Sequence, residues 1–396
     1  MPARSQPPGC EDRLLCRSGH AGDVRRCSDV RAQVVLRCCP LRRSLSDSET
    51  PMCAAREEDV LQDLVGSDGA ITEAANGVAA RFGLGRVTHL SALPGAGGRN
   101  VLIETEEEPW VLRLGLSPAT LGGVSSGLPT GLDVLRSERF FAAAVREKTA
   151  LRSPWPYEID DARDLIPVPY AIMPHLAGTT LGWAEDHDWG AVGTALAEAA
   201  LELHRQSWPA AGNWDPATND ILPSENDPAT RCRALVLDLI DRTAMTSEPL
   251  DSSSTEWLSE RLVHLYAEPV KDACLVHGDF VIGNLRMAEV HRTWSVTGIF
   301  DFENARIGDP EEDLVVHMWW ACYGRRPEAA VSFLRRYQRD GPVSTRIYGY
   351  VLASLLGNWE YGRRMNFLWY GDARTFLDWA GPLYDDFDRV VAAAVG

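Results

Sequence analysis

The feature that most constrains the fold is a change of hydrophobic pattern near residue 181 of the chain. Before this point, apolar residues fall into short runs bounded by Gly and Pro, which is typical of strands joined by tight turns. After it, apolar residues recur every three or four positions over long stretches, which is typical of helices. The sequence therefore predicts an α+β protein in which a small β-rich lobe precedes a larger, mainly helical lobe.

The same patterns locate the individual elements. In the first lobe we expect strands at 86–93, 100–105, 110–114, 165–168 and 170–173, and helices at 57–82 and 133–152. In the second lobe we expect helices at 189–206, 229–243, 253–267, 311–321, 328–339, 345–366 and 373–395. Two short apolar strands, at 273–276 and 296–300, interrupt these helices, and the residues that could carry chemistry follow them.

Residues 1–51 differ from the rest of the chain. They are rich in Arg, Cys and Ser, show no sustained period, and precede a second methionine, Met52. We expect them to be a disordered or non-native extension and exclude them from the fold. A metal site that includes His20 is the alternative, although the cysteines do not form the paired half-sites of a zinc module.

The distribution of cysteines and apolar residues predicts a cytoplasmic protein. Six of the nine cysteines lie in the first 53 residues, and the other three are scattered. A secreted disulfide framework would spread its cysteines through the fold, so we expect a reducing environment. The sequence also lacks an apolar run of the roughly 18 residues that a membrane span requires.

The charge of the chain limits its partners. The formal charge is −17, and it becomes −20 once residues 1–51, with nine arginines and six acids, are set aside. Binding to phosphate-rich surfaces needs clusters of Lys and Arg, so we expect neither nucleic acid nor membrane as a partner. A cationic small-molecule partner and simple solubility both remain open as reasons for the acidity.

The most specific stretches are 275–284, 296–303 and 308–314. Asp279 follows a buried strand and a turn that Gly278 permits, so its carboxylate could accept a proton from an attacking hydroxyl. Asn284 and Asp301 could reach the same place, and their oxygens are ligands that Mg²⁺ prefers. A base beside an Asn and an Asp that hold metal is the pattern of phosphoryl transfer.

These residues resemble the motifs of the aminoglycoside phosphotransferase and choline kinase family. The H-G-D-x(4)-N motif is matched by His277, Gly278, Asp279 and Asn284, the later Asp triplet by Asp301-Phe302-Glu303, and the G-D-P-x-x-D-L tail by residues 308–314. The resemblance implies a two-lobed protein-kinase-like fold. Residues 52–82 would be an N-terminal helical segment, 83–176 the nucleotide-binding lobe, and 177–396 the catalytic and substrate-binding lobe. It also implies ATP or GTP with Mg²⁺, Asp279 as catalytic base, and Asn284 and Asp301 as metal ligands.

The resemblance also indicates where the nucleotide would bind. A Gly-rich loop that includes Gly97 and Gly98 would cover the phosphates, and Arg113 would contact them in place of the lysine of protein kinases. Glu147 on the following helix is the expected partner of Arg113, with Glu138 as the alternative. Adenine would contact backbone groups near Met173 and His175.

Other residues in the motifs have structural interpretations. We expect His204 to be a core histidine, Asp309 to cap the helix that starts with Pro310, and Glu303 either to touch metal or substrate or to be solvated. Aromatic and acidic residues after position 311 could bind a polyhydroxylated or amine-bearing ligand, although Trp at helical spacing is usually core.

The resemblance implies an enzyme that transfers the γ-phosphoryl group of ATP to a hydroxyl group of a small molecule. An aminoglycoside-like antibiotic is the first candidate for the acceptor, because the chain is acidic. Choline, homoserine, macrolides and sugars are alternatives within the family. A catalytically silent nucleotide-binding module is the alternative of another class, and retention of Asp279, Asn284 and Asp301 together argues against it.

Overall fold

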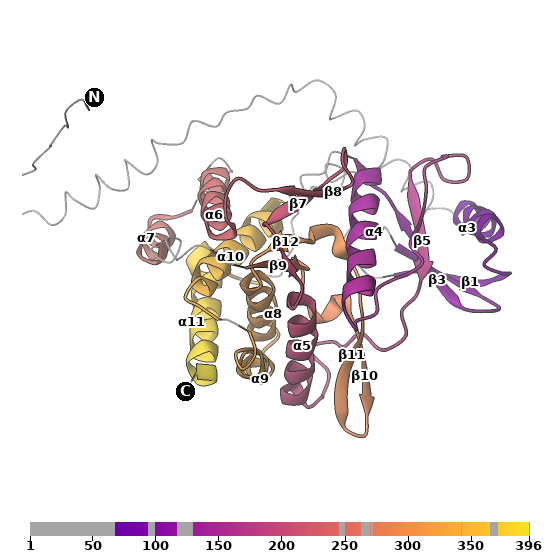
Figure 1. Cartoon of the computed structure of the whole chain (residues 1–396). Helices are drawn as coiled ribbons and strands as arrows, with labels where there is room; N and C mark the ends of the chain where they lie inside the picture. The colour runs from indigo at the N-terminus through magenta and orange to yellow at the C-terminus, as the bar shows by residue number, and fades with distance from the viewer. Residues whose placement is uncertain are drawn as a thin grey trace, which may run out of the picture. The chain divides into compact units, whose positions relative to one another are not determined.

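The computed structural model describes residues 68–93, 100–116, 130–244, 250–262, 270, 272–341, 343–364 and 371–395. Over these residues it confirms a β-rich lobe followed by a mainly helical lobe (Figure 1). Gly97 and Gly98, expected to cover the phosphates, lie outside the described residues, as does the expected extension at 1–51.

The first lobe is built on an antiparallel sheet of five strands in the order β1-β2-β3-β5-β4. The strands are β1 (Val87–Ala92), β2 (Asn100–Thr105), β3 (Pro109–Leu114), β4 (Glu158–Asp160) and β5 (Tyr170–Pro174). Helix α3 (Asp68–Phe82) covers one face of the sheet, and α4 (Gly131–Lys148) lies on the opposite side (Figure 1).

Alternation along β3 places Arg113 on the side of α4. Leu112 and Leu114 pack in the apolar cluster that α3 contributes to. Since successive side chains of a strand point to opposite faces, the intervening Arg113 faces the other side. The sheet thus presents a cation toward the second lobe.

One predicted strand is wrong. The stretch 165–168 is not a strand, and β4 takes the fifth place in the sheet instead. Pro167 and Pro169 flank Val168 and cannot donate ladder hydrogen bonds, so this segment packs Ile166 and Val168 into the core as a loop.

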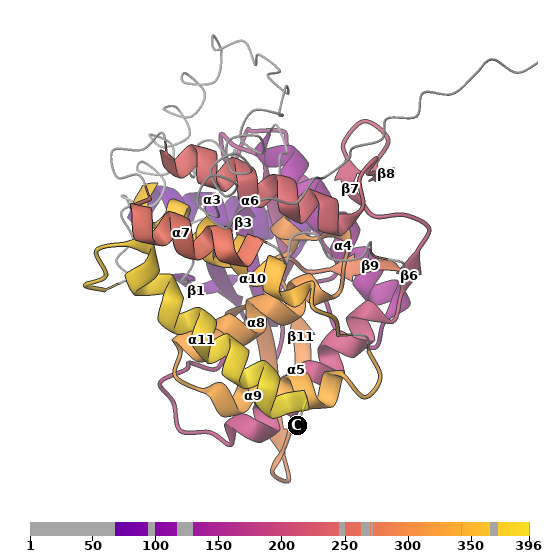
Figure 2. The ribbon, with the colours of Figure 1, turned by 90° about the vertical axis from the view of Figure 1, so that its left-hand side faces the viewer.

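The second lobe contains seven described helices. They are α5 (Trp189–His204), α6 (Pro228–Ala244), α7 (Ser252–Arg261), α8 (Glu311–Tyr323), α9 (Pro327–Tyr337), α10 (Ile347–Arg364) and α11 (Phe376–Val395). Helix α9 packs against α5, α8 and α11, and α11 crosses in front of α8 and α9 in Figure 2. No helix in the described ranges combines the length and apolarity needed to span a membrane.

Short strands that the sequence did not predict connect these helices. A five-stranded sheet has the order β6-β9-β12-β7-β8, with β6 (Ser207–Trp208), β7 (Gly212–Asp215), β8 (Asp220–Pro223), β9 (Ala273–Val276) and β12 (Arg306–Gly308). A hairpin joins β10 (Leu285–Val290) and β11 (Thr293–Ile299). The sequence predicted β9, whose four residues are all apolar, and part of β11, but it missed the six-residue β10. Strands β6, β7, β8 and β12 have only two to four residues, too few to show a period.

These strands bring the three motif stretches together. Val276 at the end of β9 pairs with Arg306 of β12, so the loop after β9 lies beside the loop that follows β11. Within the hairpin, Leu285 pairs with Ile299, which places Asn284 near the end of β11. The first motif and the later Asp triplet are therefore neighbours in space.

Candidate active site

The turn after β9 requires a glycine. Gly278 has φ +78°, and a Cβ atom there would lie 2.3 Å from the backbone oxygen of Asn304. A side chain at this position would be strained by its backbone conformation and would also collide with the neighbouring loop. The glycine thus allows the loops after β9 and β11 to approach closely.

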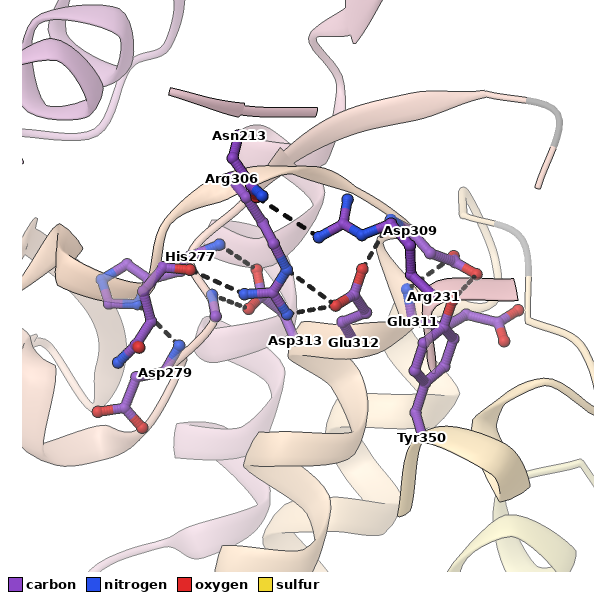
Figure 3. A network of polar contacts seen from close by, with 12 residues as sticks. Asn213, Arg231, His277, Asp279, Arg306, Asp309, Glu311, Glu312, Asp313 and Tyr350 are labelled. Atoms are coloured by element: carbon purple, nitrogen blue, oxygen red, sulfur yellow. Dashed lines mark hydrogen bonds and ion pairs between the residues drawn. The ribbon is translucent and has the colours of Figure 1, made fainter. Parts of the chain in front are cut away.

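A buried carboxylate from α8 holds this turn. Asp313 accepts the backbone N–H of His277 and that of Gly278, each over 2.8 Å (Figure 3). It also receives His204 Nε2 at 3.0 Å, and His204 Nδ1 contacts the Tyr337 hydroxyl. Burial alone would raise the pKa of Asp313, but the hydrogen bonds from His204 and His277 hold it below its ordinary value. His204 is a core histidine, as predicted.

His277 orients the turn. Its Nε2 contacts the backbone oxygen of Phe300 at 2.9 Å, and its Nδ1 accepts the backbone N–H of Asp279 at 3.3 Å. These contacts require a neutral ring with the proton on Nε2. Burial lowers the pKa of His277, in agreement with a neutral ring.

Asp279 and Asn284 are joined directly. The Asn284 side-chain nitrogen donates to Asp279 Oδ2 over 2.8 Å and to the Asp279 backbone oxygen over 3.0 Å. Since its nitrogen is engaged in this way, the atom that Asn284 can offer to a cation is its amide oxygen. Burial, followed by the charge of Asp301, raises the pKa of Asp279 to about 7.

Asp301 lies at a strained position after β11. Its φ of +69° is left-handed, a conformation that costs a non-glycine residue about 1 kcal/mol or more. This conformation begins the short 3-10 helix η3 (Phe302–Asn304), which also carries Glu303. Strained residues held by their surroundings are frequent at functional sites.

Arg113 joins three carboxylates from two parts of the chain, α4 and the loop after β11. Its Nη2 contacts Glu138 of α4, Asp301 Oδ1 at 3.0 Å and Glu303 Oε2 at 3.3 Å. Glu138 also accepts the Tyr157 hydroxyl over 2.7 Å. Burial raises the pKa of Glu138 to about 7. The charge of Arg113 opposes this rise, and the charges of Asp301 and Glu303 add to it.

The predicted pairing of Arg113 with Glu147 is wrong. Glu138 is buried on the face of α4 toward the sheet, whereas Glu147 is exposed nine residues further along the helix. Nine residues on a helix correspond to two and a half turns, so the two side chains project from opposite sides. Burial of Phe141 and Val145 with Glu138 was the signal that marks the inner face.

The residues expected at the adenine site lie at the C-terminal end of the inner strand β5 and just after it. Met173 is buried in β5 and pairs with Val111 of β3. The backbone N–H of His175 donates to the Pro109 oxygen over 3.0 Å, and its ring contacts Arg286 at 2.6 Å. Adenine contact at Met173 and His175 remains a prediction.

The arrangement fits a divalent cation. Carboxylate oxygens of Glu138, Asp301 and Glu303 lie within 4.8 Å of one another. Three carboxylates and one guanidinium leave an excess of negative charge, and carboxylate and amide oxygens are the ligands that Mg²⁺ prefers. Sequence reasoning left Glu303 and Glu138 as alternatives, and the structure places both at the centre of the site.

Asp309 belongs to a second, structural cluster. Its buried carboxylate accepts the Tyr350 hydroxyl at 2.9 Å and the backbone N–H of Glu311 (Figure 3). It also accepts Arg346 Nε at 2.8 Å. These contacts tie the start of α8 to α10. The structural role expected for Asp309 is confirmed, although α8 begins after Pro310.

The aromatic residues of the second lobe are mostly core. Trp319, Trp359 and Trp379 are buried and pack on one another. Trp369 and Tyr370, also candidates for substrate contact, lie outside the described residues.

Comparison with known proteins identifies the family. A family model described as "Phosphotransferase enzyme family" (APH) matches residues 89–348, which include every motif residue of the site. The chain belongs to this family. No curated protein sequence matches it.

Solved structures of aminoglycoside phosphotransferases share the phosphotransferase fold. APH(4)-Ia is 17% identical with a TM-score of 0.55, and the match covers 82% of this chain and 100% of that one. The GDP and kanamycin complex of APH(2")-IIIa is 20% identical with a TM-score of 0.53, covering 80% and 97%. A thermostable APH(4)-Ia mutant with ADP and hygromycin B is 17% identical with a TM-score of 0.54, covering 81% and 98%. At these identities the likeness concerns the fold.

Proposed function

We propose that the chain is an ATP- and Mg²⁺-dependent phosphotransferase that phosphorylates a hydroxyl group of a small molecule. The observation that carries the proposal is the grouping of Asp279 and Asn284 beside Asp301 and the buried Arg113. Phosphoryl transfer requires a proton acceptor, oxygen ligands for a metal ion and a fixed positive charge in one place.

The residues divide the work as follows. Asp279 accepts the proton of the acceptor hydroxyl at its carboxylate, and Asn284 holds that carboxylate in place through its side-chain N–H. Asp313 fixes the backbone on the N-terminal side of the base. Arg113, oriented by Glu138, supplies a positive charge for phosphate oxygens.

Asp301 and the amide oxygen of Asn284 would hold Mg²⁺, with Glu303 and Glu138 close enough to contribute. When bound, the ion neutralises charge on the phosphates. Solved structures of similar phosphotransferases are complexes with GDP, ADP or AMP-PNP, which supports a nucleotide as the phosphoryl donor here.

The acceptor is a separate question. The similar structures bind kanamycin and hygromycin B, which supports a hydroxyl-bearing small molecule and makes an aminoglycoside-like antibiotic one candidate. Kinases of choline, homoserine or sugar type are the alternatives, and a reducing cytoplasm is the expected setting.

ADP formation tests the proposal against a silent nucleotide-binding module. Wild type, Asp279→Asn and the control Asp272→Asn, an exposed acid just before β9, would be assayed with ATP, Mg²⁺ and a panel of hydroxylated acceptors. We expect Asp279→Asn to lose about 10²- to 10⁴-fold in kcat and Asp272→Asn to match wild type. Equal turnover in Asp279→Asn and wild type would contradict the role of Asp279.

A further inference from the structure

A cavity of about 470 Å³ lies next to the catalytic turn. Gly278, which precedes Asp279, forms part of its wall, and so do Glu303 and Asn304 from the loop after β11. Met173 and His175, expected at the adenine site, do not line it. The cavity is therefore placed to receive the phosphoryl acceptor rather than the nucleotide base.

The two carboxylates among the described lining residues are both held by arginines. Glu312 receives Arg306 Nε at 3.1 Å, and its other oxygen accepts the backbone N–H of Asp309 (Figure 3). Glu303 contacts Arg113. A polycationic ligand would have to compete with these ion pairs for each carboxylate.

The positive charge of Arg231 is not matched in the same way. Arg231, on α6, lines the cavity, and the side-chain contact it makes within the described residues is to a neutral oxygen, Asn213 Oδ1, at 3.4 Å (Figure 3). Its Nη1 is buried and has no hydrogen-bond partner among the described residues. Burial lowers the pKa of Arg231, as expected for a guanidinium that has lost water without gaining an anion of its own.

A second donor without an acceptor lies in the same wall. Trp214 of β7 is 4% exposed, and its Nε1 has no partner within the described part of the chain. A buried donor left unpaired costs about 1–3 kcal/mol, so two in one cavity indicate that an acceptor-rich group belongs there. A small rotation of the flexible arginine side chain would present its guanidinium to a group in the cavity.

We propose that this cavity binds the carboxylate of the acceptor substrate through Arg231 and Trp214, so that the acceptor is a small hydroxy acid rather than a polycationic amine. Arginine suits this role because its planar fork matches the two oxygens of a carboxylate. The inference rests on the proposed phosphotransferase function, because the acceptor hydroxyl must then reach the neighbouring Asp279. It also implies that the acidity of the chain as a whole does not select a cationic acceptor.

Matched acceptor pairs test this proposal. Glycerate, homoserine and gluconate would be compared with their amides, in which an uncharged group replaces the carboxylate, and with kanamycin and hygromycin B, using Asp279-dependent ADP formation. We expect kcat/KM for each carboxylate to exceed that of its amide by about tenfold or more. In Arg231→Gln the KM for carboxylates should rise by about 10- to 100-fold while the KM for the amides changes little.

Two further variants separate recognition from damage to the fold. Trp214→Phe keeps an aromatic side chain, although a smaller one, and removes the donor, so KM for carboxylates should rise by a few-fold. Arg233→Gln removes the same charge from the same helix at a position that does not line the cavity, and carboxylate preference should persist. An unchanged preference in Arg231→Gln, or better turnover of the aminoglycosides than of any carboxylate, would overturn the proposal while leaving the phosphotransferase function intact.

Binding can also be read without catalysis. The same carboxylates should raise the Tm of the wild-type protein in a saturable manner, and the rise should be absent in Arg231→Gln. No rise in wild type would overturn the proposed carboxylate site. Absence of Asp279-dependent ADP formation with every acceptor would instead contradict the proposed function, so the two failures are distinguishable.

Discussion

Arg113 on β3 and Glu138 on α4 form a buried ion pair, with 5% and 2% of their surfaces exposed. The same guanidinium nitrogen reaches Asp301 at 3.0 Å, in the loop after β11. One side chain therefore links the sheet and helix of the first lobe to the loop after β11 in the second. Glu138 therefore helps to fix the position of the Arg113 side chain and to hold α4 beside the site.

Removing the charge of Glu138 should impair catalysis. We expect Glu138→Gln to lower kcat/KM by about 10- to 100-fold, because Arg113 loses the carboxylate that orients it, and to lower the free energy of unfolding by about 2–4 kcal/mol. Glu147→Gln, on the exposed side of the same helix, is the control and should match wild type. ADP formation and urea unfolding measure the two effects; equal losses in both variants would contradict this assignment.

The turn at Gly278 should not tolerate a methyl group. Gly278→Ala adds left-handed strain and a contact of 2.3 Å with the Asn304 oxygen, so we expect a loss of about 3 kcal/mol or more in unfolding free energy, together with lost activity. Gly83 also has a positive φ, +66°, but open space around its Cβ position. Gly83→Ala should cost only about 1 kcal/mol and leave kcat unchanged, which separates strain from collision. Similar losses in the two variants would show that the close approach to Asn304 is unimportant.

Removal of Mg²⁺ and removal of the Asp301 charge should both impair ADP formation, because we expect Asp301 to bind the metal. A chelator should abolish ADP formation and added Mg²⁺ should restore it. Asp301→Asn should raise the Mg²⁺ concentration needed for half-maximal rate by about tenfold or more, because a charged oxygen ligand becomes neutral. Asp272→Asn is the control, and a Mg²⁺ titration of the rate measures the effect. An unchanged requirement in Asp301→Asn would remove Asp301 from the metal site.

The sequence predicted the parts of the molecule where local signals are strong. The helices of the second lobe show a period over many residues, and the motif around Asp279 has fixed spacing, so both were predictable. The choice between Glu138 and Glu147 was not, because it depends on which side of α4 meets the sheet. The packing of the buried face of α4, which includes Phe141 and Val145, decides that orientation, and this is a tertiary property.

The cavity and its unpaired donors could not be predicted for a different reason. Asn213, Arg231 and Arg306 come from three separate segments, and strands β7 and β12 that position two of them are too short to show a period. The unmatched charge of Arg231 depends further on Glu312 being held by Arg306, a tertiary contact. The overall acidity of the chain left open both a cationic acceptor and simple solubility, and the proposed carboxylate site favours solubility as the reason.

A buried histidine should make the protein sensitive to acid. His317 on α8 lies against Phe333, its two ring nitrogens have no partner among the described residues, and burial lowers its pKa from 6.5 to about 3. Below pH 6.5 the unfolded chain therefore binds a proton at His317, whereas the folded protein binds this proton only at about pH 3. The resulting stability is fully present above pH 6.5 and is lost as the pH falls through this window.

The variant His317→Leu lacks the titrating ring and should not show this loss. Its free energy of unfolding, relative to that of wild type, should therefore increase by about 1.4 kcal/mol for each pH unit below 6.5. Urea unfolding at pH 7.5, 6.0 and 5.0 measures the difference, and a constant gap between the two proteins would refute the role of His317.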